Sequence, residues 1–232
     1  MTTKPFTAVP IIDIAPFLHG DAAAKRAVAQ EVAQACETIG FLYIDGHGFD
    51  PAMIERSQAA ARAFYALPEE EKRKVDMNRF PNHRGYVGEF HGTPGSRQQY
   101  ARWESFKVGF ETPADDPEFL AGVRFYGPNA WPEQPAEFRP AMEAYYGAML
   151  GLMRTMFGLF AAALELDEDH FRRWTNKPAS IMNVNHYRGR GGAADGVPTG
   201  VGAHSDYECF AILWQDGSGG LQLLNQAGDW ID

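Results

Sequence analysis

Apolar residues recur at helical spacing in the first part of the chain. Between Val28 and Ile39 they fall three or four residues apart, so they share one face of a helix. We expect this helix to run from Ala22 to Thr38, with Asp21 as its N-cap and Gly40 at its end.

Two further helices follow from similar signals. Asp50-Pro51 combines a capping residue with a proline at the first helical position, which predicts a helix that extends to about Ala66. A long apolar stretch predicts a helix from about Pro135 to Leu164. Asp167 is expected to cap a short helix that ends at Trp174.

Short apolar runs between turn residues predict the strands. The expected strands are Val9 to Ile14, Phe41 to Ile44 (buried), Trp103 to Gly109, Ile181 to Tyr187, Cys209 to Gln215, Leu221 to Leu224, and one that starts at Asp229. The segment Asn78 to Gly95 reads as a loop, and Gly189 to Gly202 as a glycine-rich loop. Helices followed by a meander of strands are typical of an α+β protein whose β part is a sandwich or a barrel.

Composition and charge exclude several classes of partner. A formal net charge of −9 disfavours a nucleic-acid partner, because phosphate binding needs basic side chains. The apolar run from Ala8 to Leu18 is broken by Pro10, Asp13 and Pro16, so it does not read as a signal peptide. We expect a cytoplasmic protein that does not enter a membrane, and we take the apolar run from Ala144 to Leu164 as a buried core helix. The two cysteines, Cys36 and Cys209, do not suggest a disulfide framework. The oligomeric state is not predicted.

The triplet His204-Ser205-Asp206 is the strongest candidate for chemistry. On an extended strand, residues two positions apart point to the same side, so one imidazole and one carboxylate would face the same point. This is two thirds of a mononuclear iron(II) site with two histidines and one carboxylate. By itself the triplet is a weak signal, and its alternative is a polar pair in a surface turn.

Several short strings together resemble one known family. They are Val9-Pro10-Ile11-Ile12-Asp13, Gly40-Phe41-Leu42-Tyr43-Ile44 with His47-Gly48, Arg84-Gly85-Tyr86, Glu104-Ser105-Phe106, Asn185-His186-Tyr187, Gly202-Ala203-His204-Ser205-Asp206 and Gly219-Gly220-Leu221-Gln222. In this order the chain resembles the isopenicillin N synthase-like branch of the iron(II)/2-oxoglutarate-dependent dioxygenase superfamily over nearly its whole length.

The resemblance implies an α+β fold with a double-stranded β-helix (jelly roll) core, incomplete at the C-terminus here, and a helical N-terminal region. We divide the chain into an N-terminal dioxygenase region (residues 1–125), a long core helix with its connection (126–175) and the first part of the jelly-roll core (176–232).

The resemblance also implies the site. It implies that His204 and Asp206 bind Fe(II) and that Asn185 and Tyr187 face the co-substrate 2-oxoglutarate, while His186 points the other way and is structural or faces the substrate. With dioxygen, such a site oxidises a small-molecule substrate by hydroxylation, desaturation or cyclisation, with release of succinate and carbon dioxide. The residues Arg84, Tyr86 and His91 are candidates for lining the substrate pocket, with a loop-stabilising role as the equal alternative.

One part of the family pattern is missing from the 232 residues. The family has a second histidine about fifty residues after the His-x-Asp triplet and an Arg-x-Ser soon after it, but no histidine follows His204 and no basic residue follows Arg190. We therefore expect the sequence to be part of a longer protein, which an intact-mass measurement would test. Two alternatives stay open: an iron oxidase that does not use 2-oxoglutarate, and a catalytically inactive remnant that acts at most as a binding protein. If the 232 residues are the whole molecule, we expect weak iron binding and little or no turnover.

Overall fold

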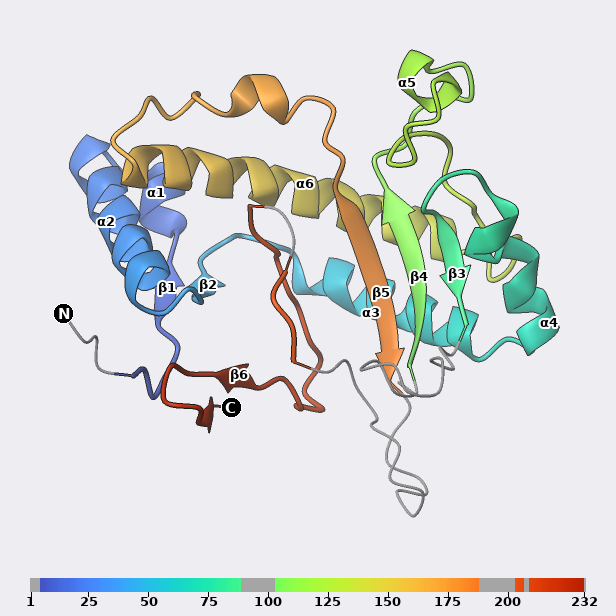
Figure 1. Ribbon diagram of the computed structural model, residues 1–232, viewed down its shortest axis with the longest axis horizontal. Coiled ribbons are helices and arrows are strands. Elements are labelled where there is room, and N and C mark those ends of the chain that lie inside the picture. Colours follow the sequence, from blue (N-terminus) through green and yellow to red (C-terminus); the bar gives the residue numbers. More distant parts are fainter. Residues whose placement is uncertain (1–4, 89–102, 188–202, 207–208, 232) are drawn as a thin grey trace. The chain divides into compact units, whose positions relative to one another are not determined.

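The computed structural model describes residues 5–88, 103–187, 203–206 and 209–231. The chain divides into two compact units, each built from separated segments (Figure 1). Unit 1 combines residues 1–49, 149–176 and 205–232, and unit 2 combines residues 50–148 and 177–204. The three regions expected from the sequence do not coincide with these two units, because each unit contains segments from several regions. The three regions therefore stay a prediction.

Unit 1 holds the N-terminal helices and a small parallel sheet. Helix α1 (Ala15–His19) precedes α2 (Ala22–Thr38), which has the predicted bounds and the predicted cap: the Asp21 side chain accepts hydrogen bonds from the amides of the second and third helical residues. Strand β1 (Ile11–Asp13) pairs in parallel with β2 (Tyr43–Asp45). The short 3-10 helix η3 (Arg172–Trp174) stands where a short α-helix was expected.

The core of unit 1 lies between α2, β1 and the second half of the long helix α6 (Phe138–Ala163). It contains Ile12, Ile14, Phe17, Val28, Val32, Ala35, Leu152, Met156 and Leu159. The strand around Tyr43 was predicted to be buried, and this is wrong for part of it: Phe41 is 46% exposed and Tyr43 is 47% exposed. Only alternate residues, Leu42 and Ile44, pack against the core, because side chains of a strand point alternately to its two faces.

The last segment of unit 1 differs from the prediction. Between Cys209 and Gln222 the structure contains no regular strand, although Phe210 and Ile212 do pack against the core. A strand needs a hydrogen-bonded neighbour, and this segment has none among the described residues. The strands β6 (Leu223–Leu224) and β7 (Trp230–Ile231) form an antiparallel pair.

Unit 2 is organised around a three-stranded antiparallel sheet. Strands β3 (Gly85–Val87), β4 (Trp103–Gly109) and β5 (Ile181–Tyr187) lie in this order (Figure 1). The predicted bounds of β4 and β5 are confirmed, whereas β3 lies in a segment that was predicted to be a loop. Glycine at position 85 allows the strand to start there, because its φ of +104° is unfavourable for other residues.

Further helices of unit 2 precede β3 and follow β4 in the sequence. Helix α3 (Pro51–Tyr65) begins at the predicted Asp50-Pro51 signal, with the Asp50 side chain accepting from an amide of the first turn. It is followed by α4 (Glu69–Lys72), the 3-10 helices η1 (Arg73–Val75) and η2 (Met77–Arg79), and later α5 (Pro117–Leu120).

Aromatic side chains form the core of unit 2. The Phe64 ring of α3 lies 5.1 Å from the Phe106 ring of β4 and 4.8 Å from the Phe138 ring of α6, measured between ring centroids. All three side chains are fully buried. This core covers one face of the sheet, so β4 is held with its even-numbered side chains inward.

Helix α6 is the one described helix that is long and apolar enough to cross a membrane by length and composition. Its residues Phe138 and Met142 are buried in unit 2, and Leu152 and Leu159 are buried in unit 1. One face of the helix thus contributes to both cores, whereas only 33% of its most apolar 18-residue window is buried, so the expectation of a buried helix holds for that face alone. Together the helices and the small sheets make an α+β protein; a jelly roll is not seen within the described residues.

Candidate active-site residues

The two predicted iron ligands lie in an irregular segment. His204 and Asp206 are both exposed, and neither lies in a regular strand. The extended strand on which their same-side geometry would rest is therefore not seen at these two residues, and their iron ligation stays a prediction. Within the described part of the chain, no group of three or more His, Cys, Asp or Glu side chains is close enough to hold a metal ion. An imidazole and a carboxylate suit iron(II), so the donor types fit, but the described residues offer an incomplete ligand set.

Strand β5 presents Asn185 and Tyr187 on one face. Both residues are exposed, and the residue between them, His186, is on the opposite, half-buried face. This alternation agrees with the predicted phase of the strand. Burial raises the pKa of Tyr187, and a hydrogen bond with Asn185 acts in the opposite direction. The two side chains are therefore coupled and available on the same side of the sheet.

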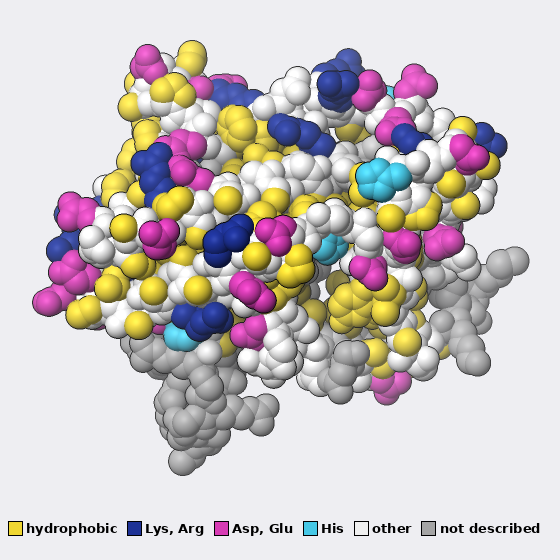
Figure 2. Space-filling model, turned by 180° about the vertical axis from the view of Figure 1, so that it is seen from behind, with side chains coloured by type: hydrophobic (Ala, Val, Ile, Leu, Met, Phe, Trp, Pro, Cys, Tyr) yellow, Lys and Arg dark blue, Asp and Glu magenta, His cyan; other side chains and the backbone are white. Residues whose placement is uncertain are grey.

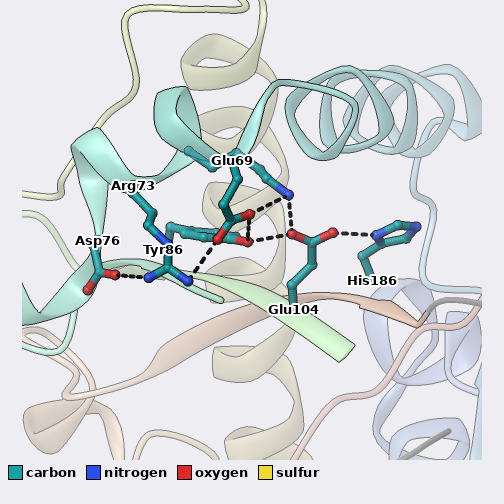
Figure 3. A network of polar contacts seen from close by, with 7 residues as sticks. Glu69, Arg73, Asp76, Tyr86, Glu104 and His186 are labelled. Carbon is teal, nitrogen blue, oxygen red and sulfur yellow. Dashed lines mark hydrogen bonds and ion pairs between the residues drawn. The ribbon is translucent and has the colours of Figure 1, made fainter. Parts of the chain in front are cut away.

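The opposite face of β5 leads into a buried polar network (Figure 3). The His186 Nδ1 atom lies 3.0 Å from Oε1 of Glu104 on β4. The other carboxylate oxygen of Glu104 accepts a hydrogen bond of 2.5 Å from Lys72 Nζ and one of 2.6 Å from the Tyr86 hydroxyl. Glu104, Lys72 and Tyr86 are all almost fully buried.

The network continues to the surface through Glu69. Its carboxylate accepts a hydrogen bond of 3.1 Å from the Tyr86 hydroxyl, and it lies 2.8 Å from a guanidinium nitrogen of Arg73, which also pairs with Asp76 (Figure 3). The network thus joins α4, η1, β3, β4 and β5 by charged hydrogen bonds, which are stronger than neutral ones.

These contacts shift the acidity of two groups. The pKa of Glu104 lies below its ordinary value: burial by itself raises it, and the hydrogen bonds from Lys72, Tyr86 and His186 together lower it by more. Burial and the neighbouring Glu104 carboxylate raise the pKa of Tyr86 far above its ordinary value. Glu104 is therefore a carboxylate and Tyr86 a neutral donor at neutral pH.

Two of the candidate substrate residues lie in the interior. Arg84 is fully buried, and its guanidinium donates hydrogen bonds to the carbonyl oxygens of His83 and Phe125. Tyr86 is 1% exposed and belongs to the buried network. These contacts match the loop-stabilising role that was the alternative for both residues. The third candidate, His91, lies outside the described residues.

Sequence reasoning missed Lys72 and Glu104 as interacting residues. Lys72 ends the acidic run Glu69-Glu70-Glu71, a pattern typical of a solvated helix surface. One signal was available: Glu104 stands at an even-numbered position of its strand, and the other even-numbered residues, Phe106 and Val108, are apolar.

Comparisons with known proteins identify the family. Residues 9–134 match the family model described as the N-terminal region of the non-haem dioxygenase in morphine synthesis. The 2-oxoglutarate-Fe(II) type oxidoreductase hxnY of Emericella nidulans is 34% identical over 97% of this chain. The 2-oxoglutarate-dependent dioxygenase citB of Monascus ruber is 33% identical over 100% of it.

Solved structures agree on the fold. The crystal structure of full-length Neurospora crassa T7H in complex with alpha-KG and thymine matches 97% of this chain and 70% of its own, with a TM-score of 0.76 and 24% sequence identity. This chain spans 66% of the length of the Emericella relative and 72% of that of the Monascus relative. The chain belongs to the iron(II)/2-oxoglutarate-dependent dioxygenase superfamily, in its isopenicillin N synthase-like branch.

Proposed function

We propose that the protein is an oxygenase that uses Fe(II) and 2-oxoglutarate to oxidise a small molecule. The proposed outcome is hydroxylation, desaturation or cyclisation of the substrate, with release of succinate and carbon dioxide. Family membership supports this proposal, because the family uses Fe(II) and 2-oxoglutarate. The triplet His204-Ser205-Asp206 is the observation that assigns the proposed iron site to particular residues. It offers one imidazole and one carboxylate in an exposed segment.

In this proposal His204 and Asp206 supply two of the protein ligands of the iron. When bound, the iron would supply the redox chemistry, and the protein would orient the reactants and exclude side reactions. Asn185 and Tyr187 would face 2-oxoglutarate, because both project from the exposed face of β5. The amide of Asn185 and the hydroxyl of Tyr187 are suitable donors to a carboxylate.

The small size of the proposed substrate is supported by one related structure. The related fold of Neurospora crassa T7H holds alpha-KG and thymine in its crystal structure. On the face shown in Figure 2, basic and acidic side chains lie interspersed with hydrophobic ones. We also propose the jelly-roll core and the cytoplasmic location that the sequence suggests.

Succinate production tests the proposal. The protein incubated with ferrous iron, 2-oxoglutarate and a set of candidate small molecules should form succinate, and His204→Ala should abolish it. His170→Ala is the matched control, since His170 is an exposed histidine outside the proposed site. Succinate formation that persists unchanged in His204→Ala would overturn the assignment of the ligand.

A further inference from the structure

The sheet of unit 2 has one face that its aromatic core does not cover. Residues directly opposite each other on β4 and β5 are Trp103 with Tyr187, Ser105 with Asn185, and Lys107 with Asn183. Because side chains alternate along a strand, these six residues share the face opposite to Glu104 and Phe106. We call this set of six residues the polar face.

The cation of the polar face, Lys107, has no acidic partner among the described residues. It is half-buried, and burial lowers its pKa. No described carboxylate lies within 4.0 Å of its ammonium nitrogen, whereas other lysines of the unit, such as Lys72 and Lys177, are paired with acids. A half-buried charge without a partner is costly, so an anion at this position would stabilise it.

The surroundings of Lys107 are cationic as well. The pKa of His83 is lowered, first by burial and then by the positive charges of Arg124, Lys107 and Arg84. Arg84 is also influenced by the carboxylate of Glu111, so the three basic side chains and this one acid leave the surroundings of His83 and Lys107 positive on balance. Such a region attracts anions.

Hydrogen-bond donors stand next to this charge. Ser105, two residues before Lys107 on the same face, is fully buried, and its hydroxyl has no hydrogen-bond partner among the described residues. The exposed amides of Asn183 and Asn185 lie directly across from Lys107 and Ser105. Side chains directly opposite on antiparallel strands have Cβ atoms about 5 Å apart, so the Lys107 ammonium and the Asn183 amide are within reach of one small ligand.

The other end of the polar face is aromatic. The ring centroids of Trp103 and Tyr187 are 6.4 Å apart. Trp103 precedes Lys107 by four residues on β4, which corresponds to about 13 Å along a strand. The two ends of the polar face therefore differ, with a ring pair at one end and an ammonium group at the other.

We propose that the polar face binds the carboxylate of a small organic acid, with Lys107 as its counter-ion and the amide of Asn183 as its hydrogen-bond donor. The proposal rests on the proposed function, because the acid is the small molecule that the oxygenase would oxidise, whereas 2-oxoglutarate is already assigned to Asn185 and Tyr187. An ionised carboxylate only accepts hydrogen bonds and carries the opposite charge to Lys107, so it matches the donors on this face.

Calorimetric titration of the iron-free chain tests this proposal without any turnover. The probes are 3-phenylpropionate, 2-oxoglutarate and the uncharged 3-phenylpropanamide. Each is titrated into the unchanged chain, into Lys107→Met, which removes the charge, and into Lys107→Arg, which keeps it. Lys74→Met is the matched control, because Lys74 is an exposed lysine of the same unit that pairs with Glu71.

We expect Lys107→Met to weaken binding of 3-phenylpropionate at least tenfold, Lys107→Arg to restore most of it, and Lys74→Met to leave it unchanged. Binding of 3-phenylpropanamide should not depend on Lys107. The proposal is overturned if 3-phenylpropionate does not bind, or if Lys107→Met binds it as tightly as the unchanged chain. Loss confined to 2-oxoglutarate would also overturn it, because Lys107 would then serve the co-substrate.

Because iron is absent from the titration, its outcome is independent of the iron ligands. Carboxylate binding without succinate formation would support the subsite and contradict the oxygenase reaction. Succinate formation that is unaffected by Lys107→Met, together with unchanged carboxylate affinity, would contradict the subsite alone.

Discussion

Glu104 is held in the interior by three donors, and this makes its ionisation part of the stability of the protein. Its carboxylate is bonded to Lys72, Tyr86 and His186, and its pKa is below the ordinary value. A carboxyl group with a depressed pKa in the folded state stabilises the fold above its unfolded pKa. This contribution is lost as the pH falls through the folded pKa.

The predicted consequence is a pH-dependent effect of Glu104→Gln. At pH 7 we expect this variant to lower the free energy of unfolding by about 3 kcal/mol, because the buried ammonium of Lys72 then keeps only the half-exposed carboxylate of Glu69, 3.3 Å away, as a described acidic partner. The difference from the unchanged protein should shrink below about pH 4, near the unfolded pKa of a glutamate. Urea unfolding at a series of pH values measures this. Glu143→Gln, which changes an exposed ion pair of α6, serves as the control, and a difference that stays constant with pH would contradict the account.

The interior positions of single polar residues were beyond sequence reasoning. Arg84 and Tyr86 were expected to line a substrate pocket or to stabilise a loop, and the structure shows them buried among backbone carbonyls and the Glu104 network. Polarity predicts exposure for such residues on average. Which polar side chain finds a buried partner depends on contacts between segments far apart in the sequence, such as Lys72 with Glu104.

At the scale of elements, the Lys72 side chain ties α4 to β4. The Lys72 ammonium lies 2.5 Å from Glu104, and both side chains are at most 3% exposed. Removing one partner of a buried ion pair destabilises by about 3 to 5 kcal/mol. We therefore expect Lys72→Met to destabilise the protein by this amount, whereas Lys74→Met should change the free energy of unfolding far less, because its ion pair is exposed and screened by solvent.

A double variant separates the charge effect from packing. Lys72→Met combined with Glu104→Gln should destabilise less than the sum of the two single changes, because neither buried charge then lacks its partner. Chemical denaturation of the four proteins measures this coupling. Additive effects would show that the two groups do not interact and would contradict an ion pair that stabilises the contact between α4 and β4.

An element was predictable when the contacts that stabilise it lie within its own segment of the sequence. The helix Ala22–Thr38 has its cap and its apolar stripe within its own sequence, so its bounds were predictable. Strands β4 and β5 were also recognisable, because aromatic and β-branched residues recur along each of them: Trp103, Phe106 and Val108 in β4, and Ile181, Val184 and Tyr187 in β5. The run from Cys209 to Gln215 has a similar composition and is not a strand, because pairing requires a neighbour that local sequence does not reveal.

For the whole molecule, the order of short strings was more informative than any one of them. The resemblance pointed to the superfamily that the family model and the relatives show. Two features of the candidate site were not predictable: the irregular backbone at His204 and Asp206, and the cationic surroundings of Lys107. Both depend on tertiary contacts, whereas the identity of the His-x-Asp triplet depends only on neighbouring residues.

Iron binding by His204 and Asp206 is the central claim, and an anaerobic titration with ferrous iron tests it most directly. The electron paramagnetic resonance signal of the nitric oxide complex reports protein-bound iron. We predict that the unchanged chain binds iron at least tenfold more tightly than His204→Ala or Asp206→Ala, while His186→Ala binds it as the unchanged chain does. Equal iron affinity in the unchanged chain, His204→Ala and Asp206→Ala would contradict the claim.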